Sequence, residues 1–541
     1  MYAVEDAPYV VQDLVPSVPG RGPFPYAVQG AHVVPHPRRW LVLGVVCLAQ
    51  LTVLLDNTVV NVAIPSLNKE MGASTADIQW MVNAYSLVQS GLLLTVGSAA
   101  DRYGRKRALM AGLGVFGVGS LLASQAQSPG QLIAARAGMG VGGALLMTTT
   151  LAVVVQVFDE EERVRAIGVW ATVATAGFAA GPLIGGVLLT RFWWGSIFLV
   201  NVPVAAVALV AVARLVPESK NPVGRRPDLI GALLSTIGMV GVVYAIIAGP
   251  GHGWGFGHVV VPAVVGVVAL GGFVLWERTV AYPMLDMGFF RDRRFVGAVA
   301  GGVLVAFGMG GSFFLLTQHL QFVLGYGPLR AGLCTAPLAV VIAGLNLLGA
   351  GAWLLRRIGT PSIVLLGMGL LAAGLALVAV VGGYGYGPMV AGLVLMGAGI
   401  ALASPAMGAA LMGAIPPQRA GIAAGVNGTL TEFGSGLGIA VLGAVLGARF
   451  AALLPRSVTG TSLPAALAAA HGPGERAQVT HAFASGVSTS QLIGALAVFA
   501  GGLVSAALLR RADRHDRSAT AGPGDEDRPD GGTAPVAESA V

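Results

Sequence analysis

Fourteen runs of about twenty apolar residues follow one another along this chain of 541 residues, and they constrain its fold more than any other feature. A helix of about 20 apolar residues crosses the roughly 30 Å hydrocarbon core of a bilayer. Only 11 % of the residues are charged, whereas an ordinary soluble domain has about a quarter, so a soluble globule and a disordered chain are both excluded. The sequence predicts an all-α polytopic membrane protein. The expected spans are 41–63, 80–99, 107–124, 131–155, 164–189, 196–216, 229–248, 258–276, 295–318, 329–352, 361–382, 387–412, 421–447 and 490–510.

The loops between these spans alternate in positive charge. With the N-terminus and every second loop assigned to the cytoplasm, that side holds 25 of the 32 lysines and arginines, the other side holds six, and Arg136 lies within a span. Because cytoplasmic loops are enriched in lysine and arginine, we expect a multi-pass protein of the plasma (inner) membrane with both termini in the cytoplasm. The net charge of +7 is then a signal of topology and needs no nucleic-acid partner.

The segments outside the spans differ in composition. Residues 1–39 contain no apolar run, so we expect a cytoplasmic N-terminal tail and a first span that acts as an uncleaved insertion signal. Residues 511–541 are rich in Gly, Pro, Asp and Glu and predict a disordered cytoplasmic tail. The longest external loop, about 448–489, has an alanine-rich middle that predicts a short helix.

A short echo between two loops predicts an internal duplication. Arg102 and Gly104 follow the second span as Arg357 and Gly359 follow the tenth. Two parallel six-span halves around a central pathway are an established transporter architecture. The expected units are a first six-span half, an inserted helix pair and a second six-span half, at 40–216, 217–277 and 278–510.

Asp56 lies inside the first span, in the stretch Leu54–Pro65. A carboxylate there costs about 2.5–3.5 kcal/mol to insert, so it must face a cavity or a partner. Asn57 and Asn61 lie beside it, four residues apart, and are candidates to line a pathway. The functional interpretation is a site that binds a proton or the charge of a cationic substrate. The structural alternative is a hydrogen bond between helices.

Two more charged residues lie within spans, Glu432 in the thirteenth and Arg136 in the fourth. Glu432 is a second candidate for proton coupling, or else it makes a structural hydrogen bond to a neighbouring backbone. An unpaired buried guanidinium is costly, so Arg136 must meet a carboxylate or carbonyl groups, and Asp56 is the natural partner. An arginine beside an aspartate favours the charged carboxylate and separation favours protonation, which would couple protonation to a rocking motion. The alternative is that Arg136 snorkels to lipid headgroups.

Several weaker candidates lie in other spans. His319 ends the ninth span and Asn346 lies in the middle of the tenth; both are candidates to line the pathway, although a histidine at a helix end more often only forms a hydrogen bond. Cys47 and Cys334 give neither a disulfide framework nor a metal-ligand spacing, so no metal is expected. Five aromatic side chains either stack on a flat hydrophobic ligand or pack between helices: Trp170, Phe178, Phe307, Phe313 and Phe314.

A dense charge cluster follows the second span. Its members are Gly97, Asp101, Arg102, Gly104 and Arg105. The two glycines permit close packing, and we expect Asp101 at a helix N-terminus, where a carboxylate is favoured. The stretch predicts a conformational latch; the alternative, charges that only set topology, explains the basic residues but not Asp101 and the glycines.

The fifth span carries glycine at every fourth position. Gly177, Gly181 and Gly185 share one helix face, which permits close helix packing. Pro182, beside them, removes a backbone hydrogen bond and kinks a helix, and Gly186 completes the stretch.

In combination these stretches resemble the major facilitator superfamily, and specifically its 14-span drug:proton antiporter branch. The stretch Leu54–Pro65 is similar to the first-span signature of the branch, 97–107 to the superfamily loop motif, and Gly177–Gly186 to the antiporter motif. The resemblance extends over about 40–510. Met139 stands where the family has a glutamine three residues after the arginine of the fourth span.

The resemblance implies a major facilitator fold and proton-driven export of hydrophobic, often cationic, drugs or antibiotics. It implies that Asp56 binds a proton or the charge of the drug, and that Arg136 belongs to the proton relay. The chain contains no Walker A sequence, so we expect a proton gradient to drive transport, with no cofactor and with the monomer as the working unit. A dedicated exporter of one endogenous metabolite is the alternative with the same fold. An enzyme is not expected, because no catalytic cluster of His, Asp or Cys lies at membrane depth.

Overall fold

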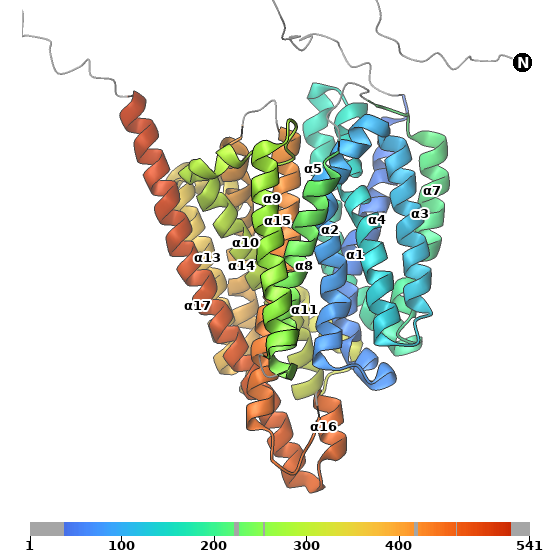
Figure 1. The fold of residues 1–541 in the computed structure, drawn as a ribbon, viewed down its shortest axis with the longest axis vertical. Helices are drawn as coiled ribbons and strands as arrows, with labels where there is room; N and C mark the ends of the chain where they lie inside the picture. The colour runs from blue at the N-terminus through green and yellow to red at the C-terminus, as the bar shows by residue number, and fades with distance from the viewer. Residues whose placement is uncertain (1–36, 221–226, 253–254, 416–419, 461, 521–541) are drawn as a thin grey trace, which may run out of the picture.

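The computed structural model describes residues 37–220, 227–252, 255–415, 420–460 and 462–520, and within these it is a bundle of long helices without strands (Figure 1). The predicted all-α membrane fold is confirmed. Nearly all of the predicted N-terminal tail and residues 521–541 of the predicted C-terminal tail lie outside the described residues.

The first six predicted spans correspond to seven helices. They are α1 (Arg39–Met71), α2 (Thr75–Tyr103), α3 (Arg105–Ser124), α4 (Pro129–Val157), α5 (Glu160–Arg191), α6 (Ser196–Leu199) and α7 (Asn201–Leu215). Three of these helices are preceded by a capping residue whose side chain accepts a backbone hydrogen bond from the first turn: Ser74, Ser128 and Asp159. Such caps satisfy N–H groups that a helix start leaves without a partner.

The remaining helices occupy the residues predicted to form the inserted pair and the second half. The inserted pair corresponds to α8 (Leu229–His252), η1 (Phe256–Val260) and α9 (Val261–Thr279). The second half corresponds to η2 (Met287–Arg291), α10 (Arg293–Gln318), η3 (His319–Val323), α11 (Pro328–Leu347), α12 (Ala350–Ile358), α13 (Thr360–Val381), η4 (Gly382–Tyr384), α14 (Tyr386–Gly413), α15 (Ala420–Leu453), α16 (Leu463–Ala469) and α17 (Gly472–Thr520).

Thirteen helices of the described part are both long and apolar enough to cross a membrane. The helix α2 is not among them, although it has 29 residues and occupies the place of the second predicted span. Its buried face carries polar side chains, among them Gln79, Asn83 and Gln89, which lower its hydropathy. The count of fourteen spans therefore stays a prediction.

The tenth predicted span, 329–352, is wrong as a single helix. The helix α11 ends at Leu347, and α12 begins at Ala350. Between them Gly349 has φ 64°, a left-handed conformation that ends helices and that glycine adopts without strain. Hydropathy continues through this break, so an apolar run alone could not reveal it.

The predicted external loop at 448–489 is much shorter in the structure. The helix α15 continues to Leu453 and α17 begins at Gly472, while α16 supplies the short helix expected in the alanine-rich stretch. The helix α17 also continues to Thr520, so residues 511–520, predicted to be disordered, are helical. At 49 residues it is about 74 Å long, far more than the roughly 30 Å apolar core of a bilayer. Hydropathy detects only the apolar part of such a helix.

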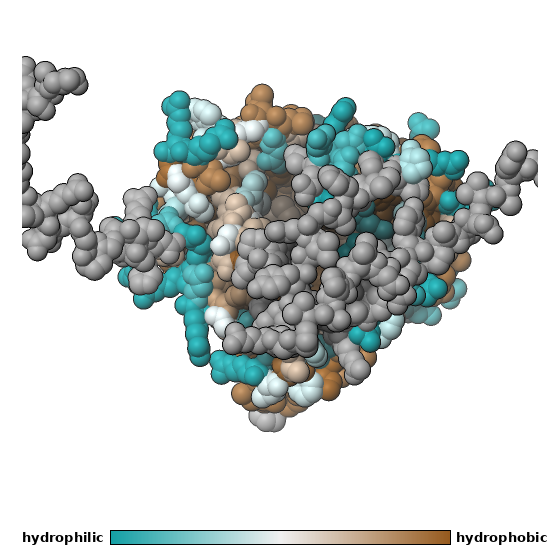
Figure 2. Space-filling view, turned by 90° about the horizontal axis from the view of Figure 1, so that it is seen from above, coloured by the Kyte–Doolittle hydropathy of each residue, from teal (hydrophilic) through white to brown (hydrophobic). Residues whose placement is uncertain are grey.

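The helices fall into two groups, α1 to α7 and α10 to α17 (Figure 1). The two groups meet along two seams. In one seam α2 packs against α15, and in the other α5 packs against α11. The helix α8 packs against both α2 and α15, so it covers the first seam. The first described helix begins and α17 ends at the same end of the bundle (Figure 1), and hydrophilic side chains gather around the rim of that end (Figure 2).

Candidate functional site

Asp56 and Arg136 form an ion pair in the interior of the first group of helices. Asp56 lies on α1 and Arg136 on α4, and their side chains are 0 % and 1 % exposed. Nη1 of Arg136 donates a hydrogen bond to Oδ2 of Asp56. The structure thus brings together the two residues whose pairing the cost of burial predicted. Because Arg136 is enclosed, the alternative that it snorkels to lipid headgroups is wrong.

Two further polar atoms of the pair also have hydrogen-bond partners. Nε of Arg136 donates to the carbonyl oxygen of Met81 at 2.9 Å, and Nδ2 of Asn201 donates to Oδ1 of Asp56 at 3.5 Å. The guanidinium lies 4.5 Å from the ring centroid of Tyr85, where the ring quadrupole attracts a cation. A buried pair is tolerated only when such additional contacts offset its desolvation.

Sequence reasoning missed three of these neighbours, Met81, Tyr85 and Asn201. A carbonyl partner such as that of Met81 leaves no trace in the sequence. The sequence did contain a signal that α2 presents a polar face to the interior. Polar residues recur along it at helical spacing, at Gln79, Asn83, Ser86 and Gln89.

Unpaired polar atoms lie near this ion pair on α2. The hydroxyl of Tyr85 and both side-chain amide atoms of Asn83 and Gln89 are buried and have no hydrogen-bond partner among the described residues. Buried polar groups without a partner are costly and are commonly satisfied by water or a ligand. This part of α2 can therefore bind water or polar groups of a substrate.

Glu432 lies at the contact between the two groups of helices. It belongs to α15, and its Oε1 accepts a hydrogen bond from Nδ2 of Asn57 on α1 at 3.5 Å. Both side chains are partly exposed, whereas Asp56 is fully enclosed. Asn61, the other asparagine of the predicted stripe, is buried and donates to the backbone oxygen of Asn57 at 3.3 Å. Glu432 and Asn57 are therefore partly accessible where α1 and α15 meet, and Asp56 is not.

The five predicted aromatic residues lie in three different environments. Phe178 on α5 and Phe313 on α10 lie with ring centroids 5.8 Å apart and so connect the two groups of helices. Phe307 and Phe314 are buried in the packing of α10. Trp170 is partly exposed, and its ring N–H has no partner among the described residues, so of the five it is the one with a donor to offer.

The predicted positions of His319 and Asn346 need correction. His319 does not end the ninth span, because the helix continues as η3 to Val323. It is buried, with Nε2 3.1 Å from the carbonyl oxygen of Gly382. Asn346 is not in mid-span but is exposed at the end of α11, where its carbonyl oxygen accepts from the N–H of Gly349. These contacts fit helix packing and helix termination.

The charge cluster that follows the second predicted span forms a junction within the first half. Gly104, with φ 122°, separates α2 from α3, and a Cβ there would lie 2.6 Å from Oε1 of Glu218. The N–H of Arg105 donates to the carbonyl oxygen of Ser219 at 2.9 Å. Lys106 and Glu218 are likewise linked, through a backbone N–H and a carboxylate oxygen 3.1 Å apart. The cluster thus binds the segment that follows α7.

Asp101 is not at a helix N-terminus, as predicted, but in the last turn of α2, where its Oδ1 accepts from Nε of Arg105 at 2.9 Å. The helix continues past Asp101 because only Gly104 adopts a helix-ending conformation. Arg102 lies in the same turn, and Gly97, one turn earlier, is only in ordinary contact with Thr148 of α4.

The glycine face of α5 packs directly on α1. A Cβ at Gly177 would lie 2.9 Å from the side chain of Leu51, one at Gly181 would overlap Thr58, and one at Gly185 would lie 2.5 Å from Val59. These positions flank Asp56, so the glycines set how closely α5 approaches the acidic helix.

The other face of the same stretch packs on the second half. Gly186 lies against the backbone of Leu329, and the carbonyl oxygen of Pro182 against Gly332 of α11. Backbone-to-backbone approach of this kind requires glycine. The antiporter-like stretch therefore contacts both α1 and the opposite half.

The described residues contain no group of three or more His, Cys, Asp or Glu side chains that could hold a metal ion. Cys47 and Cys334 are buried free thiols on α1 and α11. Nothing in this part of the chain is arranged as a metal site.

The chain is similar to known transporters in both sequence and fold. Residues 46–439 match the model of the Major Facilitator Superfamily. The chain is 35 % identical to "Multidrug efflux pump LfrA" of Mycolicibacterium smegmatis, over 88 % of this chain and 97 % of that protein. It is 38 % identical to "Puromycin resistance protein pur8" of Streptomyces alboniger, over 76 % of this chain and 82 % of that protein.

A solved structure shares the fold. It is the inward-facing, unoccupied structure of a bacterial homologue of the human lysosomal transporter Spinster, with a TM-score of 0.62, 19 % identity, and coverage of 88 % of this chain and 98 % of that chain. Together with the membrane-spanning helices described above, these similarities establish an integral membrane protein. The chain belongs to the Major Facilitator Superfamily of membrane transporters.

Proposed function

We propose that this protein is a proton-driven secondary exporter of hydrophobic, often cationic, drugs or antibiotics across the plasma membrane by alternating access. The observation that carries the proposal is the enclosed Asp56–Arg136 ion pair, an ionisable pair at membrane depth, where such groups serve transport far more often than structure. The names of relatives that match most of the chain, a multidrug efflux pump and a puromycin resistance protein, support the choice of substrate.

The two carboxylates have different access, which assigns them different roles. Asp56 is enclosed by α1, α4 and α7, so only a proton or water reaches it without a rearrangement. Glu432 is partly exposed at the contact between the halves and is accessible to a larger ligand. In this proposal Asp56 carries the proton, and Glu432 attracts the positive charge of a substrate.

The Asp56–Arg136 pair gives a route from protonation to movement. A proton on Asp56 removes the charge that holds the guanidinium, and a buried arginine without its carboxylate is strongly destabilised. Asn201 on α7 and Met81 on α2 hold the same pair. Protonation thus weakens contacts among four helices of the first half at once, which favours a different arrangement of that half.

Alternating access also requires contacts between the halves that can open and re-form. Nε2 of Gln79 on α2 donates to the carbonyl oxygens of Ile439 and Ala440 on α15, at 3.0 and 3.1 Å. In the same seam the hydroxyl of Thr429 donates to the carbonyl oxygen of Ser90 at 3.2 Å. Side-chain hydrogen bonds between membrane helices average only about 0.6 kcal/mol, so a few of them can be exchanged during a transport cycle.

The proton gradient is large enough for this work. One proton moving through 100 mV releases about 2.3 kcal/mol, and one pH unit adds about 1.4 kcal/mol. For a neutral substrate exchanged for one proton, the sum sustains a gradient of roughly 500-fold. We propose that no organic cofactor takes part, that both termini are cytoplasmic, and that the monomer is the working unit.

Proton-coupled movement of ethidium into energised everted vesicles tests the proposal. We expect uptake that an uncoupler abolishes, and loss of that uptake in Asp56→Asn at unchanged membrane insertion. Glu70→Gln is the matched control, because Glu70 is an acid on the same helix that is exposed near its end. Full uncoupler-sensitive uptake by Asp56→Asn would contradict the role of Asp56, and the absence of any proton-linked movement of drugs would contradict the proposed function.

The alternative function is a dedicated exporter of one endogenous metabolite. A relative that is named for resistance to a single antibiotic supports this alternative. The same vesicles distinguish the two. A dedicated exporter moves one compound of a chemically mixed panel of dyes and antibiotics, whereas a multidrug exporter moves several.

A further inference from the structure

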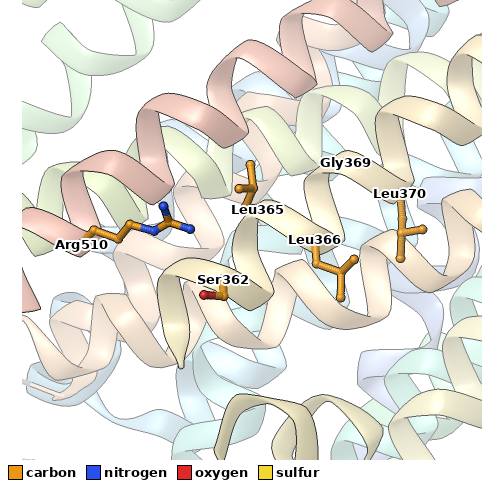
Figure 3. A pocket seen from close by; sticks show the side chains of 6 residues that line it. All are labelled: Ser362, Leu365, Leu366, Gly369, Leu370 and Arg510. Atoms are coloured by element: carbon orange, nitrogen blue, oxygen red, sulfur yellow. The ribbon is translucent and has the colours of Figure 1, made fainter. Parts of the chain in front are cut away.

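A groove runs between α13 and α17 on the outer surface of the second half of the bundle (Figure 3). Its volume is about 380 Å³. Five residues of α13 and one of α17 line it, namely Ser362, Leu365, Leu366, Gly369, Leu370 and Arg510. None of them belongs to the Asp56 site.

The wall formed by α13 is long, narrow and apolar. Its residues lie three and four positions apart, so they share one face of the helix. From Ser362 to Leu370 this face extends over about 12 Å. No atom lies within 4 Å of the position that a Cβ of Gly369 would take, so the glycine leaves a recess between the leucines. The volume is near the lower limit of ligand sites and fits a single hydrocarbon chain.

One end of the groove is cationic. The side chain of Arg510 extends from α17 toward α13, near Ser362 and Leu365 (Figure 3). Arg510 has no carboxylate partner among the described residues, and the acid one turn further along α17, Asp513, pairs with Arg294 instead. Ser362 adds a hydroxyl and lies in the first turn of α13, where N–H groups have no acceptor within the helix. A cation and several donors at one end of an apolar groove suit a phosphate attached to a hydrocarbon chain.

The charge, and not the apolar wall, decides which lipid binds. Moving an acyl chain from the bilayer into this groove gains little, because lipid tails are as apolar as leucine. Preference for one lipid must then come from the headgroup. Arg356 and Arg357, exposed just before α13, add positive charge near the same end. We propose that the groove binds an anionic glycerophospholipid, with one acyl chain along the leucines and its phosphate at Arg510 and Ser362.

The test uses the full chain, delipidated and reconstituted in nanodiscs that contain phosphatidylglycerol and phosphatidylcholine. Native mass spectrometry then counts the lipid molecules that stay bound. We expect the wild type to retain phosphatidylglycerol in preference to phosphatidylcholine, and Arg510→Gln to bind it about fivefold less tightly, as the loss of one basic residue at an anionic surface predicts. Arg511→Gln is the matched control, because it removes the same charge one residue away from the groove.

A second variant tests the apolar wall with the charge intact. Gly369→Leu fills the recess, so we expect it to lose the retained phosphatidylglycerol although Arg510 is unchanged. Equal retention by the wild type and Arg510→Gln, or equal retention of both lipids, would overturn the proposal. So would equal losses in Arg510→Gln and Arg511→Gln, because they would show general attraction to the surface, and so would displacement of the lipid by millimolar inorganic phosphate, because it would show a site for a free anion.

Discussion

Gly332 of α11 lies directly against the backbone of Pro182 in α5, so closely that a Cβ at position 332 would be 2.3 Å from the proline carbonyl oxygen. The two residues belong to opposite halves of the transporter. No side chain fits between them, so this contact exists only while position 332 is glycine.

Gly332→Ala is therefore predicted to separate α5 from α11. Overpacking a tight contact costs about 1–3 kcal/mol, so the state that contains this contact should lose roughly 5- to 150-fold in population, and efflux should fall accordingly. Spin labels at Arg191 and Leu333, both exposed, should report a longer distance. Gly344→Ala on the same helix has open space around its new methyl group and should leave the distance unchanged. An unaltered distance in Gly332→Ala would show that the contact does not hold the halves.

The Asp56–Arg136 pair is predicted to be strongly coupled. Arg136→Gln leaves a buried carboxylate without its cation and should destabilise the protein by about 3–5 kcal/mol. Adding Asp56→Asn removes the orphaned charge, so the double variant should be more stable than the sum of the two single effects predicts. Thermal unfolding of the four proteins in detergent measures this cycle. Additive effects would mean that the two side chains do not interact in the membrane.

Gly104→Ala is predicted to weaken the junction between α2 and α3. A residue other than glycine at φ 122° is strained by about 1–3 kcal/mol, and its methyl group would meet the carboxylate of Glu218. Thermal unfolding should show the loss. Adding Glu218→Ala relieves only the collision, so recovery should be incomplete. Gly114→Ala in α3, where nothing lies near the added methyl group, should be neutral or slightly stabilising, because alanine is the better helix former.

Glu432→Gln is predicted to change substrate preference more than overall turnover. A hydrogen bond to a charged group contributes about 1.5–3 kcal/mol, so efflux of cationic ethidium should fall roughly 10- to 150-fold in kcat/KM, whereas neutral chloramphenicol should be affected little. Thr431→Ala, one residue away on an exposed position, is the control. Equal losses for both compounds would assign Glu432 to the proton pathway or to structure.

The pairing of Asp56 with Arg136 could be predicted because isolated charges are intolerable inside a membrane, and the chain offers very few of them. The contributions of Asn201 and Tyr85 could not be predicted, because uncharged residues are common in spans. Only the approach of α7 and α2 brings Asn201 and Tyr85 to the ion pair. Asp101 and Asn346 were misplaced for a related reason. Where a helix ends depends on a single glycine conformation, at Gly104 or Gly349, that hydropathy does not record.

By itself, the sequence determined that the chain is a bundle of membrane helices, which intramembrane residues are costly enough to need a partner, and which family the motifs resemble. These follow from the free energy of transferring each residue into a bilayer, which depends on residue type and local pattern. Only the tertiary structure decided that α5 contacts both α1 and α11, that Asp56 is enclosed while Glu432 is partly accessible where α1 and α15 meet, and that Arg510 completes a groove on α13. Each of these joins residues far apart in the chain, and such contacts are set by how closely whole helices can pack.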